Sequence, residues 1–215
     1  GRDRFSATSR GARGLVPDAD PLAAERDQPW PPGRFNHDLF DLNRDWFAQT
    51  QPETRLQVPE LLKHHPVLVA DVHEMGTGMS YFFPPEAEPA NPYLTGTQLA
   101  MAARVGENNA RWLDRYGKAY FTREIFDAFY PGYGSGWPNY QGYTAMVYEQ
   151  GSSRGLVARR RDGSLLNFRD TVQSQFLTSL SAIEVVAADR TRALQDFHDY
   201  RRTAVDEGRR GPVRA

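Results

Sequence analysis

Two acid–base side chains occupy corresponding places in two apolar segments of this 215-residue sequence. His73 closes the segment "PVLVADVHE", and Glu149 closes "GYTAMVYEQ". A histidine can ligate a metal or transfer a proton near neutral pH, and a carboxylate among apolar neighbours has a raised pKa that suits a general base. Each residue alone could equally be a hydrogen-bonded or solvent-exposed side chain at a strand end. Two such residues on different strands favour a site.

A third polar group occurs in "NHDLFDLNRDWF", where Asn43 and Arg44 stand side by side. We predict that these residues lie at the end of a strand. A guanidinium can hold a carboxylate through two parallel hydrogen bonds, and a neighbouring amide can donate another. The alternative is a structural ion pair of Arg44 with Asp41, Asp45 or Glu74.

The segment 129–143, "FYPGYGSGWPNYQGY", combines four tyrosines and a tryptophan with several glycines. Glycine permits backbone movement, and tyrosine brings a large contact area with a polar tip. This composition favours a loop that covers a substrate, with Tyr130 and Tyr133 as candidate covering residues. An aromatic loop that only packs against the protein is the alternative.

These residues need a sheet to bring them together. The apolar run 67–72 predicts a central strand covered on both faces, and residues 142–150 predict a second strand. Helices are predicted at 50–64 and from Thr95, which begins a capping-box pattern with Gln98, to Gly117. This alternation predicts an α/β fold with a mixed, largely parallel sheet flanked by helices, whose ligands bind at the carboxyl ends of strands.

The C-terminal part is predicted to be helical from Asp170 to about Val205. Unbroken, this helix would be about 50 Å long, so a break or two helices is an equal alternative. Its apolar residues are expected to form an inward stripe: Val172, Phe176, Leu180, Ile183, Ala187 and Leu194. We expect residues 1–165 to form a catalytic unit and residues 166–215 a helical region that packs on it or leads to a further domain.

The composition limits the partners. Lys and Arg number 26 against 27 Asp and Glu, which gives no overall field for nucleic acid or an anionic membrane. The sequence has no apolar run long enough to span a bilayer, and it has no cysteine, which excludes thiolate metal ligands and a cysteine nucleophile. We therefore expect a peptide or small-molecule partner, and no nucleic acid or membrane.

In order along the chain, these segments resemble the zinc carboxypeptidases of the carboxypeptidase A type. "GRDRF" at residues 1–5 is similar to the end of that family's Asn-Pro-Asp-Gly turn, and "DLNRDW" to its substrate-carboxylate motif. "VADVHEMG" resembles the strand that carries its last zinc-binding histidine, and "MVYEQ" the strand that carries its catalytic glutamate. The resemblance covers about residues 1–150.

The resemblance implies hydrolysis of a peptide bond beside a free carboxylate, with Zn²⁺ as cofactor. It implies that His73 is a zinc ligand, Glu149 the general base, and Asn43 and Arg44 the carboxylate-binding pair. Arg34 is the candidate that stabilises the oxyanion, in competition with Arg10 and Arg13, and either Tyr130 or Tyr133 is the mobile tyrosine. The compartment stays open, and an extracytoplasmic location, periplasmic or secreted, is favoured because many members of the family are exported.

The sequence departs from the family at the metal site. The family takes one histidine and one glutamate from a His-x-x-Glu motif, whereas none of the chain's histidines is followed by glutamate three residues later. We interpret the chain as a fragment whose remaining ligands lie upstream in a longer protein. It is then expected to be inactive alone, to bind zinc poorly and to associate through unpaired strand edges. A zinc deacylase or amidase, and a non-catalytic relative that binds peptide C-termini, are the alternatives.

Overall fold

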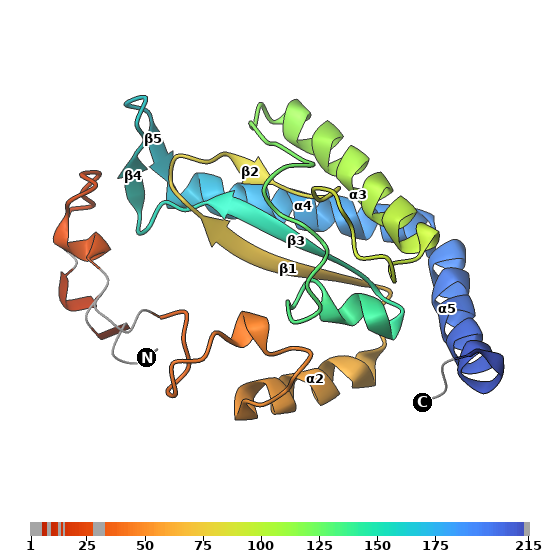
Figure 1. Ribbon diagram of the computed structural model, residues 1–215. Helices are drawn as coiled ribbons and strands as arrows, with labels where there is room; N and C mark the ends of the chain where they lie inside the picture. The colour runs from red at the N-terminus through yellow and green to blue at the C-terminus, as the bar shows by residue number, and fades with distance from the viewer. Residues whose placement is uncertain (1–5, 8–9, 13, 15, 28–32, 213–215) are drawn as a thin grey trace.

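The computed structural model describes residues 6–7, 10–12, 14, 16–27 and 33–212 (Figure 1). "GRDRF" and Arg13 lie outside the described residues. The elements in chain order are η1 (Ala24–Arg26), η2 (Leu42–Arg44), α2 (Pro52–His64), β1 (Leu68–Met75), β2 (Tyr81–Phe82), α3 (Gly96–Arg115), η3 (Trp137–Gln141), β3 (Thr144–Gly151), β4 (Val157–Arg159), β5 (Leu165–Asn167), α4 (Phe168–Ala188) and α5 (Arg190–Arg210).

The principal sheet has the strand order β1-β3-β2. β1 runs parallel to β3 from the pair Leu68–Thr144 to the pair Met75–Gly151, and β2 pairs antiparallel to β3. The prediction of an α/β fold with a mixed sheet is confirmed. With one parallel and one antiparallel pairing, however, the sheet is small and is not largely parallel. A separate hairpin of β4 and β5 leads into α4.

The core lies between β3, β2 and two helices, α3 and α4, which pack against each other; α4 runs behind the sheet in Figure 1. β3 is almost entirely buried, as its apolar sequence predicts. Aromatic side chains fill much of the space, and Tyr81 and Tyr148 lie 6.3 Å apart between ring centroids. The Tyr81 hydroxyl shares a 2.7 Å hydrogen bond with Thr178 of α4, which satisfies its polar end inside the core.

The helix predicted from Thr95 is confirmed as α3. The Thr95 and Gln98 side chains form the reciprocal capping box, and Gly117 follows the helix with a φ of 62°. In the middle of α3, Gly106 packs against the loop after β2. A Cβ at this position would collide with the Pro84 carbonyl oxygen, so this close approach requires glycine.

β1 differs from its prediction as a strand covered on both faces. It lies at the edge of the described sheet, and Val72 is 51% exposed. The apolar run correctly predicted a strand. It could not predict how many neighbours the strand has.

The "DLNRDW" segment is not the end of a strand, so that prediction was wrong. Leu42–Arg44 form the short 3-10 helix η2, and the Asp41 carboxylate accepts a hydrogen bond from the Asn43 backbone N–H at its start (3.0 Å). An aspartate that hydrogen-bonds the backbone two residues later favours a turn over an extended strand. The motif therefore lies in a loop beneath the sheet.

The C-terminal helical region consists of two helices that meet at Asp189, which confirms the second of the two alternatives. The predicted inward stripe was wrong, because all six of its residues are exposed. The face of α4 that packs inward carries mostly small residues, Thr171, Ser174, Thr178, Ser181 and Ala182, together with Leu177. Whether residues 166–215 form a separate unit stays a prediction.

Small side chains let α4 lie close to α3, and intrahelical hydrogen bonds satisfy the buried hydroxyls. Ser174 Oγ donates to the Asp170 carbonyl at 3.0 Å, and Thr178 Oγ1 donates to the Ser174 carbonyl at 3.1 Å. The apolar residues of α4 then face outward beside the free edge of β1. There they border an open groove of about 620 Å³, the outer groove, lined by Val72, Phe168, Val172 and Phe176 among others.

Within the part of the chain that the structure describes, no helix is both long and apolar enough to cross a membrane.

We expect copies of the chain to associate through the outer groove and the β1 edge, because exposed apolar surface and an unpaired strand favour contact. The double variant Val172→Glu/Phe176→Glu, at two exposed residues that line the groove, should move the mass measured by size-exclusion chromatography with light scattering toward that of the monomer. Leu56→Glu is the matched control, because Leu56 is 77% exposed on α2 and does not line the groove. Equal effects of both changes would contradict this origin of association.

Candidate functional site

His73 and Glu149 are direct neighbours across the parallel pair of β1 and β3. Their Cα atoms are register partners, near the carboxyl ends of both strands. Side chains at such a pair point to the same face of the sheet. The two residues that the sequence singled out are thus brought together.

A pocket of about 150 Å³ contains nearly all of the predicted site residues. Its walls include Arg34, Asn43, Arg44, His73, Tyr133 and Glu149, together with Ile125, Phe126, Asp127, Ser135 and Val147. Arg10 is exposed and does not line this pocket. Arg10 and Arg34 are the two candidates for the oxyanion arginine that the structure describes. Only Arg34 lines the pocket.

Asn43 connects three segments of the site. Its side-chain oxygen accepts a hydrogen bond from the Gly134 backbone N–H at 2.7 Å, which directs its amide nitrogen toward His73 Nε2 at 3.3 Å. The Gly134 backbone approaches so closely that a Cβ there would meet the Asp71 carboxylate at 2.7 Å. The glycine-rich loop, η2 and β1 are therefore held against one another.

Asp41 holds the two arginines of the pocket. One of its carboxylate oxygens lies 2.8 Å from Arg34 Nε and 3.7 Å from Arg44 Nη1. The ion pair with Asp41 that the sequence offered as an alternative for Arg44 is therefore present. It does not remove Arg44 from the pocket, and a guanidinium has five donors, so further groups can bind.

The tyrosine loop contributes Tyr133 to the pocket and places Tyr130 outside it. The Arg44 guanidinium lies over the Tyr133 ring, 4.6 Å from its centroid. Tyr130 packs edge-on against Tyr133 with the ring centroids 5.0 Å apart, and its hydroxyl donates to the Arg44 carbonyl at 3.2 Å. Tyr130 thus supports the loop, and Tyr133 faces the pocket.

The imidazole of His73 is paired with a carboxylate. His73 Nε2 lies 2.8 Å from Asp71 Oδ2, and this contact raises the pKa of His73 although burial opposes it. Gln175 of α4 donates to the His73 backbone carbonyl at 3.0 Å. The ring is therefore fixed both through its side chain and through its strand.

Burial raises the pKa of Glu149, and the nearby imidazole of His73 opposes the rise. Its Oε2 atom is buried and has no hydrogen-bond partner among the described residues. Glu149 also lines the pocket. A carboxylate with a raised pKa in the wall of a pocket can accept a proton from a bound water or substrate.

Sequence reasoning missed two acidic residues of the site. Asp41 was considered only as an ion-pair partner, although its place between two arginines could be inferred from the shared segment. Asp127 lines the pocket from a loop more than 50 residues beyond β1. No local pattern around Asp127 distinguishes it from other exposed acidic residues.

The donor set does not complete a zinc site. Catalytic zinc takes three protein ligands, commonly two histidines and a carboxylate or three histidines. Within the ranges that the structure describes, no group of three His, Asp or Glu side chains could hold a metal ion. His73 is one imidazole with its Nε2 directed at Asp71.

We expect isothermal titration with Zn²⁺ to find no tight, stoichiometric site on the 215-residue chain. Complete zinc sites in proteins bind with a free energy of roughly 10–16 kcal/mol. Because the site here is incomplete, we expect a dissociation constant larger than about 1 µM, which corresponds to less than that free energy. His73→Ala should abolish any weak binding, whereas His37→Ala, on an exposed loop, should not. A tight site of one zinc per chain would contradict the incomplete donor set.

Glu149→Gln should stabilise the chain at neutral and alkaline pH, because burial disfavours the carboxylate. Since the pKa is raised in the folded chain, the folded state binds more protons than the unfolded state between the two pKa values. The destabilisation by Glu149 is therefore absent below the unfolded pKa and complete above the folded pKa. Melting temperatures of both proteins should differ at pH 8 and converge near pH 4; a constant difference would contradict this.

The fold is similar to that in the crystal structure of a metallo-carboxypeptidase from Burkholderia cenocepacia, with a TM-score of 0.56. The two sequences are 16% identical, and the match covers 77% of this chain and 42% of that chain. The chain therefore spans about two-fifths of the length of the matched protein. Neither a family model nor a curated protein matches the sequence. The comparison supports a distantly carboxypeptidase-like α/β fold.

Proposed function

We propose that the chain is the substrate-holding and proton-transfer part of a zinc-dependent metallocarboxypeptidase-type hydrolase that removes C-terminal residues from peptides. The observation that carries the proposal is the composition of one pocket. Two guanidiniums, an amide, an imidazole, a tyrosine and a carboxylate with a raised pKa surround it. The fold, which is similar to a metallo-carboxypeptidase, agrees with this assignment.

In this function Arg44 and Asn43 bind the terminal carboxylate of the substrate. Arg44 is held from three sides: its Nη1 donates to the Asn43 carbonyl at 2.9 Å, its guanidinium lies over Tyr133, and Asp41 lies 3.7 Å away. A guanidinium held in this way loses little conformational freedom when a carboxylate binds.

Glu149 accepts a proton from water as the water attacks the scissile carbonyl, and it then donates this proton to the departing amine. Arg34 is the donor that stabilises the oxyanion formed at the carbonyl carbon. Asp41 positions Arg34 for this role through the 2.8 Å ion pair. The metal of such an enzyme requires ligands beyond those that the described residues supply.

A second function is favoured by the incomplete metal site. A chain that holds one imidazole and an intact carboxylate pocket could bind peptide C-termini without hydrolysing them. A zinc deacylase or amidase would use the same groups on a substrate that is not a peptide.

Carboxylate binding can be tested with a short peptide and its C-terminal amide. We expect the chain to bind the peptide acid more tightly than the amide, and Arg44→Ala to weaken acid binding about tenfold or more, the effect of losing a charged hydrogen bond. Arg55→Ala is the matched control, because Arg55 is exposed on α2 and does not line the pocket. Equal affinity for acid and amide in titration calorimetry would contradict the carboxylate site.

Hydrolysis can be tested in the protein expressed from its complete coding sequence, in the presence of zinc. Glu149→Gln should lower kcat by about 100-fold or more, as expected for loss of a general base, and leave peptide binding nearly unchanged. Retained turnover would contradict the role of Glu149. Peptide binding without turnover in the unaltered protein would favour the non-catalytic function.

A further inference from the structure

A second pocket adjoins β3 one residue beyond Glu149. Successive side chains of a strand point to opposite faces, so Gln150 points away from the face that carries His73 and Glu149. Gln150 lines a cavity of about 350 Å³, the rear pocket, together with residues beside β2, in the loop after α3, in the β4–β5 hairpin and at the start of α4. Its polar walls come from Ser80, Lys118, Gln150, Arg160, Asp170 and Ser174. None of these residues lines the pocket that contains Glu149.

Gln150 brings a buried hydrogen-bond acceptor to the rear pocket. It is only 4% exposed, and its amide nitrogen donates to the Ser80 carbonyl at 3.4 Å and to the Gly151 carbonyl at 3.1 Å. These two acceptors set the orientation of the amide, and its oxygen, Oε1, has no hydrogen-bond partner among the described residues. Gln150 also borders the outer groove, but its amide lies against Ser80, which lines the rear pocket and not the groove.

A buried acceptor without a partner costs free energy, because it has lost its hydrogen bonds to water. A ligand with an N–H or O–H group would satisfy the Gln150 oxygen and recover that cost. The first requirement on a ligand of the rear pocket is therefore a hydrogen-bond donor.

Arg160 brings a cation with free donors. Its Nε donates to the Thr77 carbonyl at 3.3 Å, which holds the guanidinium beside the end of β1. Within the described part of the chain, neither of its terminal nitrogens forms a hydrogen bond or an ion pair. Asp162 attracts it, but Asp162 is exposed, and its carboxylate accepts hydrogen bonds from Ser164. A guanidinium held at Nε can still present two nitrogens to a carboxylate.

Lys118 adds a second positive charge, which is partly neutralised. Its ammonium lies 3.6 Å from Asp170 Oδ1, and its side chain is 20% exposed. The other oxygen of Asp170 accepts a hydrogen bond from the Asn167 amide at 3.2 Å. The rear pocket thus combines two cations, Arg160 and Lys118, with one carboxylate that already has partners. The second requirement on a ligand is therefore a negative charge.

We propose that the rear pocket binds a small carboxylate that also carries an amino or hydroxyl group, of the type of a free amino acid. Its carboxylate binds Arg160 and Lys118, and its amino or hydroxyl group donates to Gln150 Oε1. Leu165 and Leu166 in the same walls provide apolar surface for a side chain. The proposal does not depend on the proposed function, because it uses none of the residues of that pocket.

The test uses four molecules with one carbon skeleton: L-leucine, its hydroxy analogue leucic acid, isocaproate, which lacks the donor, and leucinamide, which lacks the carboxylate. Titration of the 215-residue chain, followed by NMR, should give a dissociation constant of about 1 mM or lower for leucine or leucic acid, as expected for a ligand of this size. Isocaproate and leucinamide should each bind about tenfold more weakly or less, because each loses a hydrogen bond to a buried or charged group. The tighter of the two donor-bearing acids identifies the donor as amino or hydroxyl.

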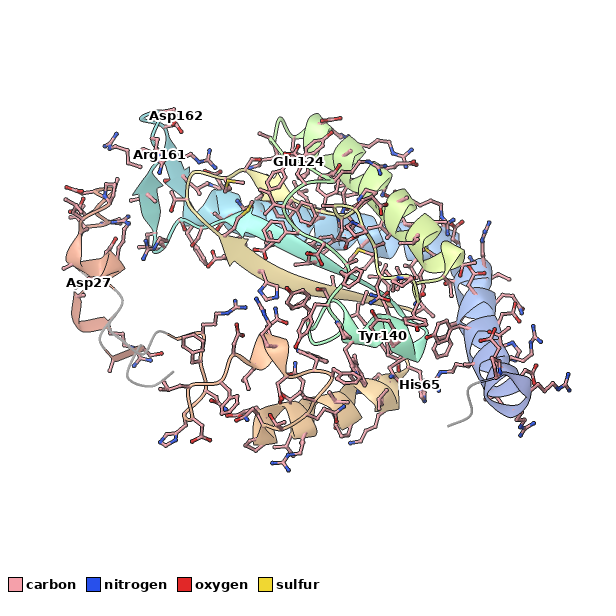
Figure 2. The ribbon with its side chains drawn as sticks, viewed as in Figure 1. Asp27, His65, Glu124, Tyr140, Arg161 and Asp162 are labelled. Carbon is pink, nitrogen blue, oxygen red and sulfur yellow. The ribbon has the colours of Figure 1, made fainter. Side chains whose placement is uncertain are left out.

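Variants assign the binding to the rear pocket. Arg160→Gln should weaken it about tenfold or more, since a charged hydrogen bond is lost. Arg161→Gln is the matched control and should have no effect, because Arg161 is exposed on the same hairpin turn, where Figure 2 labels it, and does not line the rear pocket. Arg44→Ala changes only the pocket of the proposed function, so binding at the rear pocket should survive it.

Gln150→Met removes the acceptor and retains much of the side-chain volume. It should abolish the advantage of the donor-bearing acid over isocaproate and leave isocaproate binding nearly unchanged. Melting temperatures identify any variant that fails to fold. If Arg160→Gln does not fold, the Gln150→Met comparison decides in its place.

The proposal would be overturned if neither donor-bearing acid bound saturably, or if binding were unchanged in a folded Arg160→Gln protein. Equal affinity of the unaltered chain for leucine, leucic acid and isocaproate would also overturn it. Binding that is lost in Arg44→Ala and kept in Arg160→Gln would overturn the rear pocket and support the carboxylate site of the proposed function. The two proposals can therefore fail separately.

Discussion

The parallel pairing of β1 with β3 is the constraint on which the site depends. It sets His73 beside Glu149, and the other groups attach to this pair: Asn43 contacts the imidazole, and Gln175 of α4 hydrogen-bonds the strand behind it. A shift of one residue in the register would turn one of the two side chains to the opposite face. The side chains of β3 are buried along nearly the whole strand, so such a shift would force them to repack on both faces. Hydrophobic packing therefore maintains the acid–base geometry.

The helices and strands that the sequence predicts correctly are those whose formation is determined by residues close together in the chain. The capping box at Thr95, the β-branched run before His73 and the apolar run before Glu149 each specify an element from neighbouring residues alone. The site residues followed from the rule that strand ends gather at one edge of a sheet. That rule placed His73 and Glu149 together, and their roles in chemistry stay predictions. Asn43 and Arg44 of "DLNRDW" line the same pocket as His73 and Glu149, but a turn at Asp41, rather than the predicted strand end, presents them.

The parts that could not be predicted depend on contacts between distant segments. The stripe on α4 has a helical period, yet the face of this helix that is buried carries mostly small and hydroxyl residues and packs against α3. The number of neighbours of β1 is likewise not encoded in β1. Asp127 becomes a residue of the pocket only because its loop pairs with the segment after β2, through the bridge of Ala87 with Asp127. The spacing of apolar residues in the sequence shows which face of a helix is apolar. Only the folded structure shows which face is covered by other elements.

Gly106 links the outer helix to the strand that carries Glu149. Because Gly106 has no side chain, α3 touches the Pro84 carbonyl, two residues after the end of β2. Phe82 of β2 is in turn the register partner of Glu149. A methyl group at position 106 would push α3 and this segment apart and remove the support of β2 from the carboxylate strand. The position of the candidate proton acceptor therefore depends on a side chain that is missing from a helix outside the pocket.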